Sequence, residues 1–412
     1  MTALTDFFAP GQRVFQPTLS NESALLAQEL QSLPERARGV EFCGLQFPGI
    51  DTFDPLALHP QARQTAYFMG PGLRTGLAQG RASLLALDYP GIVRHLAHSA
   101  PMDLAIAHLS EPDPDGWCSP GLSCDFLPLV WSRARRRVAH INPRMPCVAS
   151  SFRVHVSELD AQVVSEQPLL DFRDPPAGEI ERRIGALVAP LVQDGDTLQF
   201  GIGSVPLGLA QALTGHRKLR FHGGLASSAL RTLWEAGAMD RDARHTAGVV
   251  LGDASFREFI AGMDTLWLAP VDHTHHPAVL ARIPRLVAIN SAVEVDLFGQ
   301  VNAERAGGVL AAGAGGLPAF AQGALASPGG RSLICLASTA RKGTVSRIVP
   351  SLTQEGLCTL PRYLADTVVT EHGVAQVRDL SLDERAQALI AIAAPEHRES
   401  LTQSWQTLRT RL

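Results

Sequence analysis

Short apolar runs alternate along the chain with segments in which apolar residues recur at helical spacing. In the first half the clearest apolar runs are Asp103–Leu109 and Arg137–Asn142, and Glu22–Leu33 has the pattern of an amphipathic helix that Pro34 would end. Further candidate strands lie at 197–200, 219–222, 248–251, 265–269, 286–295, 332–337 and 367–370. Candidate helices lie at 179–192, 206–213, 225–236, 383–393 and 397–409. Continuously apolar strands that alternate with helices predict an α/β architecture with mainly parallel sheets.

The segment Asp171–Gly178 is the best candidate linker, because its Pro175–Pro176 pair interrupts any helix or strand. The chain has 412 residues, enough for two domains, and 45% of them are hydrophobic, enough for large cores. We therefore expect an N-terminal domain over residues 1–175 and a C-terminal domain over residues 176–412.

Charge and sequence bias exclude several classes of protein. The net charge is −4, without the basic excess of a nucleic-acid binder. The longest uncharged stretch, between Arg305 and Arg331, holds eight Gly and two Pro, and we expect glycine-rich loops there rather than a membrane span. The N-terminus lacks the basic region of a signal peptide, and the six cysteines form no C-x-x-C pair. These features predict a cytoplasmic protein without nucleic-acid or membrane partners.

Several catalytic signatures are missing. The sequence has no G-x-S-x-G, H-E-x-x-H or G-x-x-x-x-G-K-[ST] motif, which disfavours a serine thioesterase, a zinc peptidase and a P-loop NTPase. His273, His275 and His276 could suggest a metal, but no companion ligands stand at zinc-site spacing nearby. We expect a polar loop there and no metal.

Glycine-rich turns offer possible anion sites. Gly201–Pro206 follows a candidate strand and opens a candidate helix, so its backbone N–H groups could meet an anion. Gly313–Pro318 is a second such turn, and Gly70–Gly72 is a third and weaker one. Gly201–Pro206 lacks the third glycine of a dinucleotide-binding fingerprint, and the alternative for each segment, a tight structural turn, is favoured.

Two further segments combine an apolar strand with polar chemistry. The loop Ser338–Arg347 follows a strand, and its Lys342, Arg347 and hydroxyl groups could contact phosphate or could simply be solvated. Glu294 stands between Val293 and Val295 at the end of the strand 286–295. In a dry pocket its carboxylate would be poorly hydrated and nucleophilic; the alternative is an outward-facing glutamate.

Taken in order, these segments resemble the acetyl-CoA hydrolase/transferase family, a group of family I CoA-transferases that includes 4-hydroxybutyrate CoA-transferase. The similarity covers most of the chain and is densest in the second half. Its markers are 103–110, 113–121, 141–146, 194–203, 289–302, 328–330, 338–340, 346–350, 368–375 and 384–386.

The resemblance implies two α/β domains of the NagB/RpiA/CoA-transferase-like fold, each with a mainly parallel sheet flanked by helices. It places the catalytic glutamate at Glu294, which would carry acyl-glutamyl anhydride and glutamyl-CoA thioester intermediates. Gly315, Gly316 and Gly373 could supply N–H groups to the oxyanions. No permanently bound cofactor is implied, since coenzyme A arrives as a thioester substrate. Contacts with it are expected at Gly201, Gly203, Val271, His275, Gly315, Gly316, Ser338, Lys342, Arg347 and Val369.

The sequence also departs from the family pattern. Gly223–Gly224 stands where the family usually has Thr-Glu or Ser-Glu, and His275 replaces an asparagine. Leu317 and Ala319 replace Gln and Asp, and His372 replaces a common tyrosine. These positions are expected to face the acyl or carboxylate pocket, so the departures leave the identity of the substrate open.

Three functions are consistent with these residues. The first is a CoA-transferase that moves CoA between an acyl-CoA and a small carboxylic acid through Glu294. The second is an acyl-CoA hydrolase that uses the same glutamate, with water as the acceptor. The third is a CoA-thioester binding protein without catalysis. The resemblance further suggests a homodimer or a larger homo-oligomer.

Overall fold

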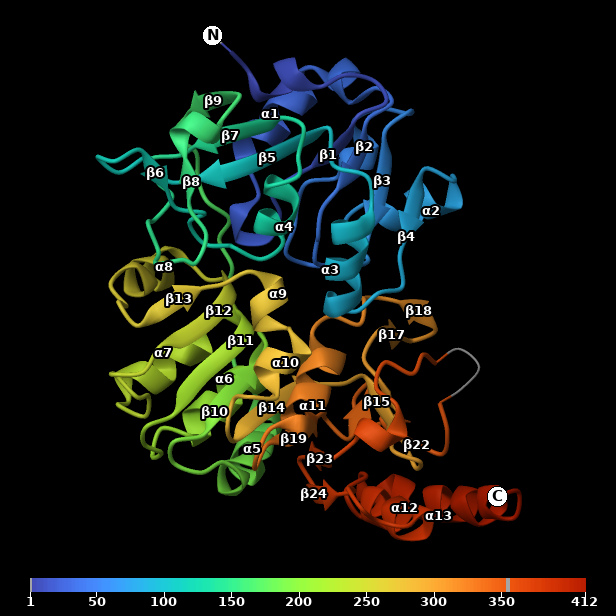
Figure 1. Cartoon of the computed structure of the whole chain (residues 1–412). Helices are drawn as coiled ribbons and strands as arrows, with labels where there is room; N and C mark the ends of the chain where they lie inside the picture. The colour runs from blue at the N-terminus through green and yellow to red at the C-terminus, as the bar shows by residue number, and fades with distance from the viewer. Residues whose placement is uncertain (1, 353–355) are drawn as a thin grey trace. The chain divides into compact units, whose positions relative to one another are not determined.

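A computed structural model describes residues 2–352 and 356–412. The chain divides into two compact units, the first containing residues up to 173 together with 245–274, and the second containing 174–244 and 275–412 (Figure 1). The division after residue 173 lies within the expected linker, Asp171–Gly178. Residues 245–274, which the sequence analysis assigned to the C-terminal domain, group with the first unit, and the two ranges 1–175 and 176–412 remain a prediction.

The first unit is built on a seven-stranded parallel sheet with the order β4-β3-β2-β1-β5-β7-β9. Its strands are β1 (Arg13–Phe15), β2 (Glu41–Cys43), β3 (Arg63–Ala66), β4 (Ala82–Leu84), β5 (Leu104–Leu109), β7 (Arg137–Ile141) and β9 (Ala161–Val164). Every residue of β5 is buried. This burial explains why five of its six residues are apolar, because side chains that alternate along a strand face the two sides of the sheet, and both sides are covered here.

Helices cover both faces of this sheet. Ala105 and Ala107 of β5 share a core with α3 (Tyr89–His98) and α4 (Leu127–Trp131), while Leu104 and Ile106 share another with α1 (Ala24–Ser32). Ser23 Oγ accepts the N–H of Leu26 and so fixes the start of α1. The predicted helix Glu22–Leu33 is therefore confirmed, with slightly shorter bounds.

Smaller elements complete the first unit. They are α2 (Leu73–Ala78), β6 (Trp117–Cys118), β8 (Val154–His155), β12 (His245–Val250), α8 (Ala254–Ala261), β13 (Leu266–Leu268) and α9 (Val271–Thr274). The expectation of a polar loop over His273–His276 was wrong for its first half, because His273 and Thr274 end α9. His275 and His276 connect α9 to the next helix, which His276 caps by accepting the N–H of Ala278 through its ring.

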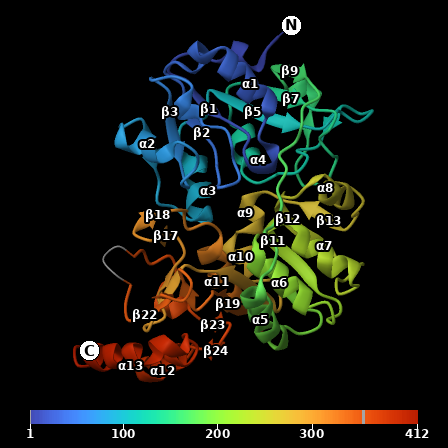
Figure 2. The same cartoon turned by 180° about the vertical axis from the view of Figure 1, so that it is seen from behind.

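The second unit contains the strand order β11-β10-β14-β19-β23-β24, in which only the last pair is antiparallel. The strands are β10 (Thr197–Phe200), β11 (Arg220–Ala226), β14 (Leu286–Ser291), β19 (Arg331–Cys335), β23 (Thr367–Thr370) and β24 (Gly373–Gln376). The helices are α5 (Glu179–Val188), α6 (Ser204–Ala212), α7 (Ser228–Glu235), α10 (Pro277–Leu280), α11 (Leu317–Ala326), α12 (Leu382–Ala391) and α13 (Pro395–Arg409). α12 and α13 lie side by side in both views (Figures 1 and 2).

Between β14 and α11, and again after β19, the chain makes short excursions from this sheet. They contain β15 (Glu294–Asp296), β16 (Val301–Asn302), β17 (Arg305–Ala306), β18 (Val309–Leu310), β20 (Thr339–Ala340), β21 (Val345–Ser346) and β22 (Ile348–Val349). The single strand predicted over 286–295 is wrong: it ends at Ser291, and Glu294 opens β15 in a separate three-stranded sheet. The segment 286–295 is mostly apolar, but its two halves pair with different strands.

The expectation of loops throughout the stretch from Arg305 to Arg331 was also partly wrong. Its second half forms α11, in which Ala319, Phe320 and Ala324 pack against α10 and β14. Gly323 suits this packing, because a Cβ there would come within 2.4 Å of the Cβ of Leu280. Among the described residues, no helix is both long enough and apolar enough to span a membrane.

Candidate active site

The functional candidates of the second unit gather at one edge of its sheet. β10, β14, β19 and β23 are parallel, so the segments that follow them all begin at the carboxyl edge, where α/β proteins bind ligands. These segments carry Gly201 and Gly203, Glu294, Ser338 and Gly373. α11 leads back into β19 through a short connection, so its first turn, at Gly316, lies at the same edge.

Glu294 is half-buried at the start of β15, opposite Asn302 of β16. Its Oε1 accepts a hydrogen bond of 3.0 Å from Nδ2 of Asn302. Within the described part of the chain, its second carboxylate oxygen accepts no hydrogen bond. Asn302 thus holds one oxygen of the Glu294 carboxylate, and the adjoining Val295 is fully buried.

Asn302 is itself fixed by the backbone. It is 1% exposed, its Nδ2 also donates to the carbonyl of Arg305 at 2.8 Å, and its Oδ1 accepts the N–H groups of Glu304 and Arg305. These contacts fix the orientation of the Asn302 side-chain amide, so that its Nδ2 points at Glu294. Asn302 lies inside a family marker but had no predicted role, since its spacing of eight residues from Glu294 does not reveal the β15–β16 pairing.

Gly373 stands in the tight connection between β23 and β24, paired with Thr370. Its φ of +153° is unfavourable for other residues, and a Cβ there would lie 3.3 Å from Cγ2 of Ile392. Thr370 holds the turn by donating its hydroxyl to the carbonyl of Ile392 and accepting the N–H of His372. The glycine is therefore required by backbone geometry at this edge.

Glu371, beside this glycine, was not singled out from the sequence. Its side chain is 7% exposed, and its carboxylate accepts both the N–H of Ser338 at 2.8 Å and the hydroxyl of Ser338 at 2.7 Å. The contact joins the loop after β19 to the β23–β24 turn. Ser338, predicted as a contact to CoA, therefore has both of its donors bound to the protein in this structure.

The Gly201–Gly203 turn also meets a carboxylate of the protein itself. Oδ1 of Asp174 accepts the N–H of Gly203 at 2.7 Å, and its Oδ2 accepts the hydroxyl of Ser228 at 2.6 Å. Gly203 has a φ of +106°, and a Cβ there would meet no atom within 4 Å. At the amide of Gly203 the acceptor is the protein's own Asp174, and contact of Gly201 and Gly203 with CoA remains a prediction.

The basic loop after β19 forms the hairpin β20–β21. Its turn holds three successive residues with positive φ, namely Arg341 at +49°, Lys342 at +58° and Gly343 at +91°. Lys342 is exposed at this turn, while the carbonyl of Arg347 accepts the N–H of Val295 at 2.9 Å. The structure thus brings Arg347 to the strand of Glu294 and leaves Lys342 at the hairpin tip.

His275 lies against two glycines, Gly224 and Gly316, and packs on Phe320 with ring centroids 4.6 Å apart. The ring is buried, and this desolvation, together with the nearby His222, holds the pKa of His275 well below its usual range. Its imidazole is therefore neutral at physiological pH. Gly315 precedes this contact in a left-handed conformation, with a φ of +62°.

Val271 and Val369 have fully buried side chains. Val369 is paired with Cys335 across β23 and β19, and Val271 lies in α9 of the first unit, where its N–H donates to the carbonyl of Asp125. Contact of either residue with CoA, which stays a prediction, would have to use the backbone.

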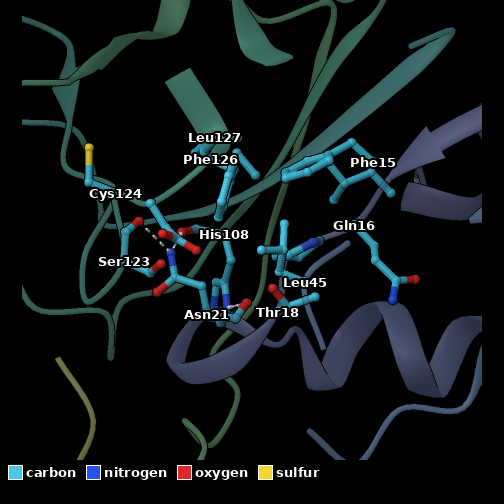
Figure 3. Close-up of a pocket in the computed structure, with 14 residues that line it drawn as sticks. Phe15, Gln16, Thr18, Asn21, Leu45, His108, Ser123, Cys124, Phe126 and Leu127 are labelled. Atoms are coloured by element: carbon cyan, nitrogen blue, oxygen red, sulfur yellow. Dashed lines mark hydrogen bonds between the residues drawn. The ribbon is translucent and has the colours of Figure 1, made fainter. Parts of the chain in front are cut away.

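The first unit contains a small cavity at the carboxyl ends of β1, β2 and β5, shown in Figure 3. It measures about 30 Å³ and is lined by Phe15, Gln16, Asn21 and His108 among others. Asp125, another lining residue, has a φ of +30°, and burial raises its pKa to about 7. The carbonyl of Gly248 accepts the N–H of Asp125, which fixes this strained residue, and the cavity has room for only a water-sized group.

No group of three or more His, Cys, Asp or Glu side chains among the residues that the structure describes could hold a metal ion. The expectation that the protein uses no metal remains a prediction.

A half-buried carboxylate at the carboxyl edge of a parallel sheet, among glycine turns, is the arrangement expected of a CoA-transferase-like α/β protein. The family profiles agree: the N-terminal domain of acetyl-CoA hydrolase/transferase matches residues 10–171, and its C-terminal domain matches residues 252–405. The chain belongs to the acetyl-CoA hydrolase/transferase family and is an enzyme of this class.

Individual relatives cover most of the chain. It is 34% identical to 4-hydroxybutyrate coenzyme A transferase of Clostridium kluyveri, over 88% of this chain and 86% of that protein. It is 32% identical to succinyl-CoA:cyclohexane-1-carboxylate CoA transferase of Geobacter metallireducens, over 84% and 80%. Among solved structures, RipA of Yersinia pestis superimposes with a TM-score of 0.90 at 27% identity, covering 99% of this chain and 97% of that one. The predicted fold class and family are thus confirmed.

Proposed function

We propose that the protein is a CoA-transferase that moves CoA between an acyl-CoA and a small carboxylic acid, with Glu294 as the nucleophile. The observation that carries this proposal is the half-buried Glu294 carboxylate, one oxygen of which is held by Asn302 at 3.0 Å. A carboxylate that has lost part of its hydration is a better nucleophile than one in open water.

The reaction begins when a Glu294 oxygen attacks the acyl-CoA carbonyl carbon. The C–S bond breaks, CoA leaves as a thiolate, and an acyl-glutamyl anhydride remains. The thiolate attacks the glutamyl carbonyl and releases the first acid as a carboxylate, which leaves a glutamyl-CoA thioester. The incoming carboxylate displaces CoA to form a second anhydride, and the thiolate then attacks its acyl carbonyl. The new acyl-CoA departs, and Glu294 regains its carboxylate.

The chain offers groups suited to each demand of this chemistry. An anhydride is less stable than a thioester, so binding energy from the distant CoA body must offset its formation. A thiolate held beside the anhydride reacts at effective concentrations of about 10⁵–10⁸ M. The N–H groups at Gly315, Gly316 and Gly373 are our candidates for stabilising the tetrahedral oxyanions. Lys342 and Arg347 are our candidates for contact with the phosphates of CoA.

An acyl-CoA hydrolase is the second candidate. Gly224 leaves no side chain at a position where the family usually has Glu, so the acceptor side has lost a polar group. Water attacking the anhydride or the glutamyl thioester would then complete a hydrolytic cycle. Acetate-independent release of CoA would favour this reading, and acetate-dependent release would favour transfer. The third alternative, a binding protein without catalysis, is not retained, because the chain belongs to a family of enzymes.

The trapping of Glu294 tests the proposal. The protein is incubated with an acyl-CoA and treated with hydroxylamine or borohydride, and the modified peptide is mapped by mass spectrometry. We expect a hydroxamate or an alcohol at Glu294 in the wild type and none in Glu294→Gln. Glu304→Gln is a matched control, since Glu304 binds Thr359 in the same part of the fold. A folded wild-type protein without modification at Glu294 would contradict the mechanism.

We further propose that the protein is cytoplasmic, that it forms a homodimer, and that it has no permanently bound cofactor. These properties follow from the family resemblance and from the composition of the chain. Light scattering of the purified protein, together with its absorption spectrum, would test the dimer and the absence of a coloured cofactor.

A further inference from the structure

His275 separates two glycines at the carboxyl edge of the second unit. A Cβ at Gly224 would come within 2.9 Å of Cε1 of His275, and a Cβ at Gly316 would come within 2.6 Å of Nε2. Both distances are shorter than real Cβ contacts, so any side chain at either position would have to displace the imidazole.

Conformation does not explain why these two residues are glycines. Gly224 lies within β11, Gly316 has a φ of −85°, and neither has the positive φ that would demand glycine. The structure instead explains the two glycines by the close approach of His275, which leaves no room for a Cβ at either position. Gly224 and Gly316 thus leave free the volume that the imidazole of His275 occupies.

The ring of His275 lies near His222 and among buried apolar side chains. His275 is 2% exposed and packs on Phe320, and Leu317 and Ala319 at the start of α11 are also buried. Desolvation keeps the imidazole neutral, so the ring contributes shape and not positive charge. If a substrate's acyl group carried a second carboxylate, that carboxylate would lose its hydration here, and the neutral His275 would not compensate with a positive charge.

We infer that His275 is a specificity-determining residue, which closes the space between β11 and the first turn of α11 and so restricts the site to short acyl groups with no second carboxylate. The inference rests on the proposed function, since the acyl group must reach Glu294 at the same edge of the sheet. A longer acyl chain would need the volume that the imidazole fills, and a single methylene in a closed pocket is worth about 10–200-fold in kcat/KM.

A substrate panel tests the restriction. Transfer to propionate is measured from acetyl-CoA, butyryl-CoA, hexanoyl-CoA and succinyl-CoA. In the wild type we expect kcat/KM for hexanoyl-CoA and succinyl-CoA to be at least about tenfold below that for acetyl-CoA. His275→Ala should raise the hexanoyl/acetyl ratio by at least about tenfold, whereas His275→Phe should keep the wild-type order because it retains a ring.

A stability cycle tests the contact separately from catalysis. Gly224→Ala should lower the Tm of the wild type but not that of His275→Ala, where the space is already open. His276→Ala is the control, because its neighbouring ring caps α10 and should leave the effect of Gly224→Ala unchanged. Additive Tm changes for Gly224→Ala and His275→Ala would overturn the inference.

The two proposals can fail separately. If the wild type transfers CoA from no substrate, the proposed function fails and the specificity inference fails with it. If His275→Ala is active and keeps the wild-type ratio of hexanoyl-CoA to acetyl-CoA within twofold, only the specificity inference is overturned.

Discussion

Asn302 donates a hydrogen bond of 3.0 Å to Glu294, and the two residues face each other across β15 and β16. The amide of Asn302 cannot turn away without breaking its contacts with the backbone of Arg305. The orientation of the glutamate is thus set by a buried neighbour eight residues along the chain.

Asn302→Ala should lower kcat by about 10–100-fold and change KM little, because the loss of a charged hydrogen bond, about 1.5–3 kcal/mol, frees the Glu294 carboxylate to rotate. Steady-state kinetics with acetyl-CoA measure this effect. Asn290→Ala is the control, since Asn290 pairs with Gln199 and not with Glu294. A kcat within twofold of wild type for Asn302→Ala would show that Asn302 is not needed to orient Glu294.

Gly373→Ala should reduce both stability and turnover. A Cβ at this φ of +153° is strained by about 1–3 kcal/mol and would press against Ile392, which shifts the turn that carries the candidate oxyanion donor. Thermal unfolding and kcat are measured together. Gly215→Ala should change neither, because a Cβ there meets no atom within 4 Å and needs no positive φ. Equal behaviour of the two variants would count against a special role for Gly373.

Glu371→Ala should destabilise the protein by about 1.5–3 kcal/mol, since it leaves two donors of buried Ser338 without their carboxylate partner. Ser338→Ala should cost less, about 1 kcal/mol, because the backbone N–H keeps its bond to Glu371. Urea unfolding followed by circular dichroism compares the two variants. The reverse order of their effects would show that Glu371 does not hold this loop in place.

Stability should fall as the pH drops from about 6.5 towards 3 through the buried His108. Burial, together with the stacked ring of His140 at 4.3 Å, lowers the pKa of His108 to about 3. The unfolded chain, with a histidine pKa of about 6.5, therefore binds more protons in this window, and acid favours unfolding by about 2 kcal/mol at pH 5.

The comparison of wild type with His108→Gln isolates this effect. Asp125 works in the opposite direction, because its raised pKa of about 7 makes stability fall as the pH rises from about 4 to 7. The difference in unfolding free energy between the two proteins, measured in urea at pH 7.5 and pH 5, should change by about 2 kcal/mol. A difference that is independent of pH would contradict the assignment to His108.

Most of the large elements of the second unit follow from local patterns. β10 is buried throughout and was predicted, β14 was predicted as the first part of a longer strand, and Glu294 was singled out because an acid stands between apolar residues. The short strands β1–β4 of the first unit were not predicted. They have only three or four residues each, too few for a clear period, and their identity as strands depends on their neighbours in the sheet.

The sequence by itself determined the α/β class, the family and the identity of the acidic residue, because these depend on local periodicity and on motifs that are contiguous in the chain. Only the tertiary structure decided that Glu294 opens a separate small sheet beside Asn302, that Glu371 holds Ser338, and that His275 fills the space over Gly224 and Gly316. Those relationships join residues from different elements, and the close packing of the fold, rather than any local preference, brings them together.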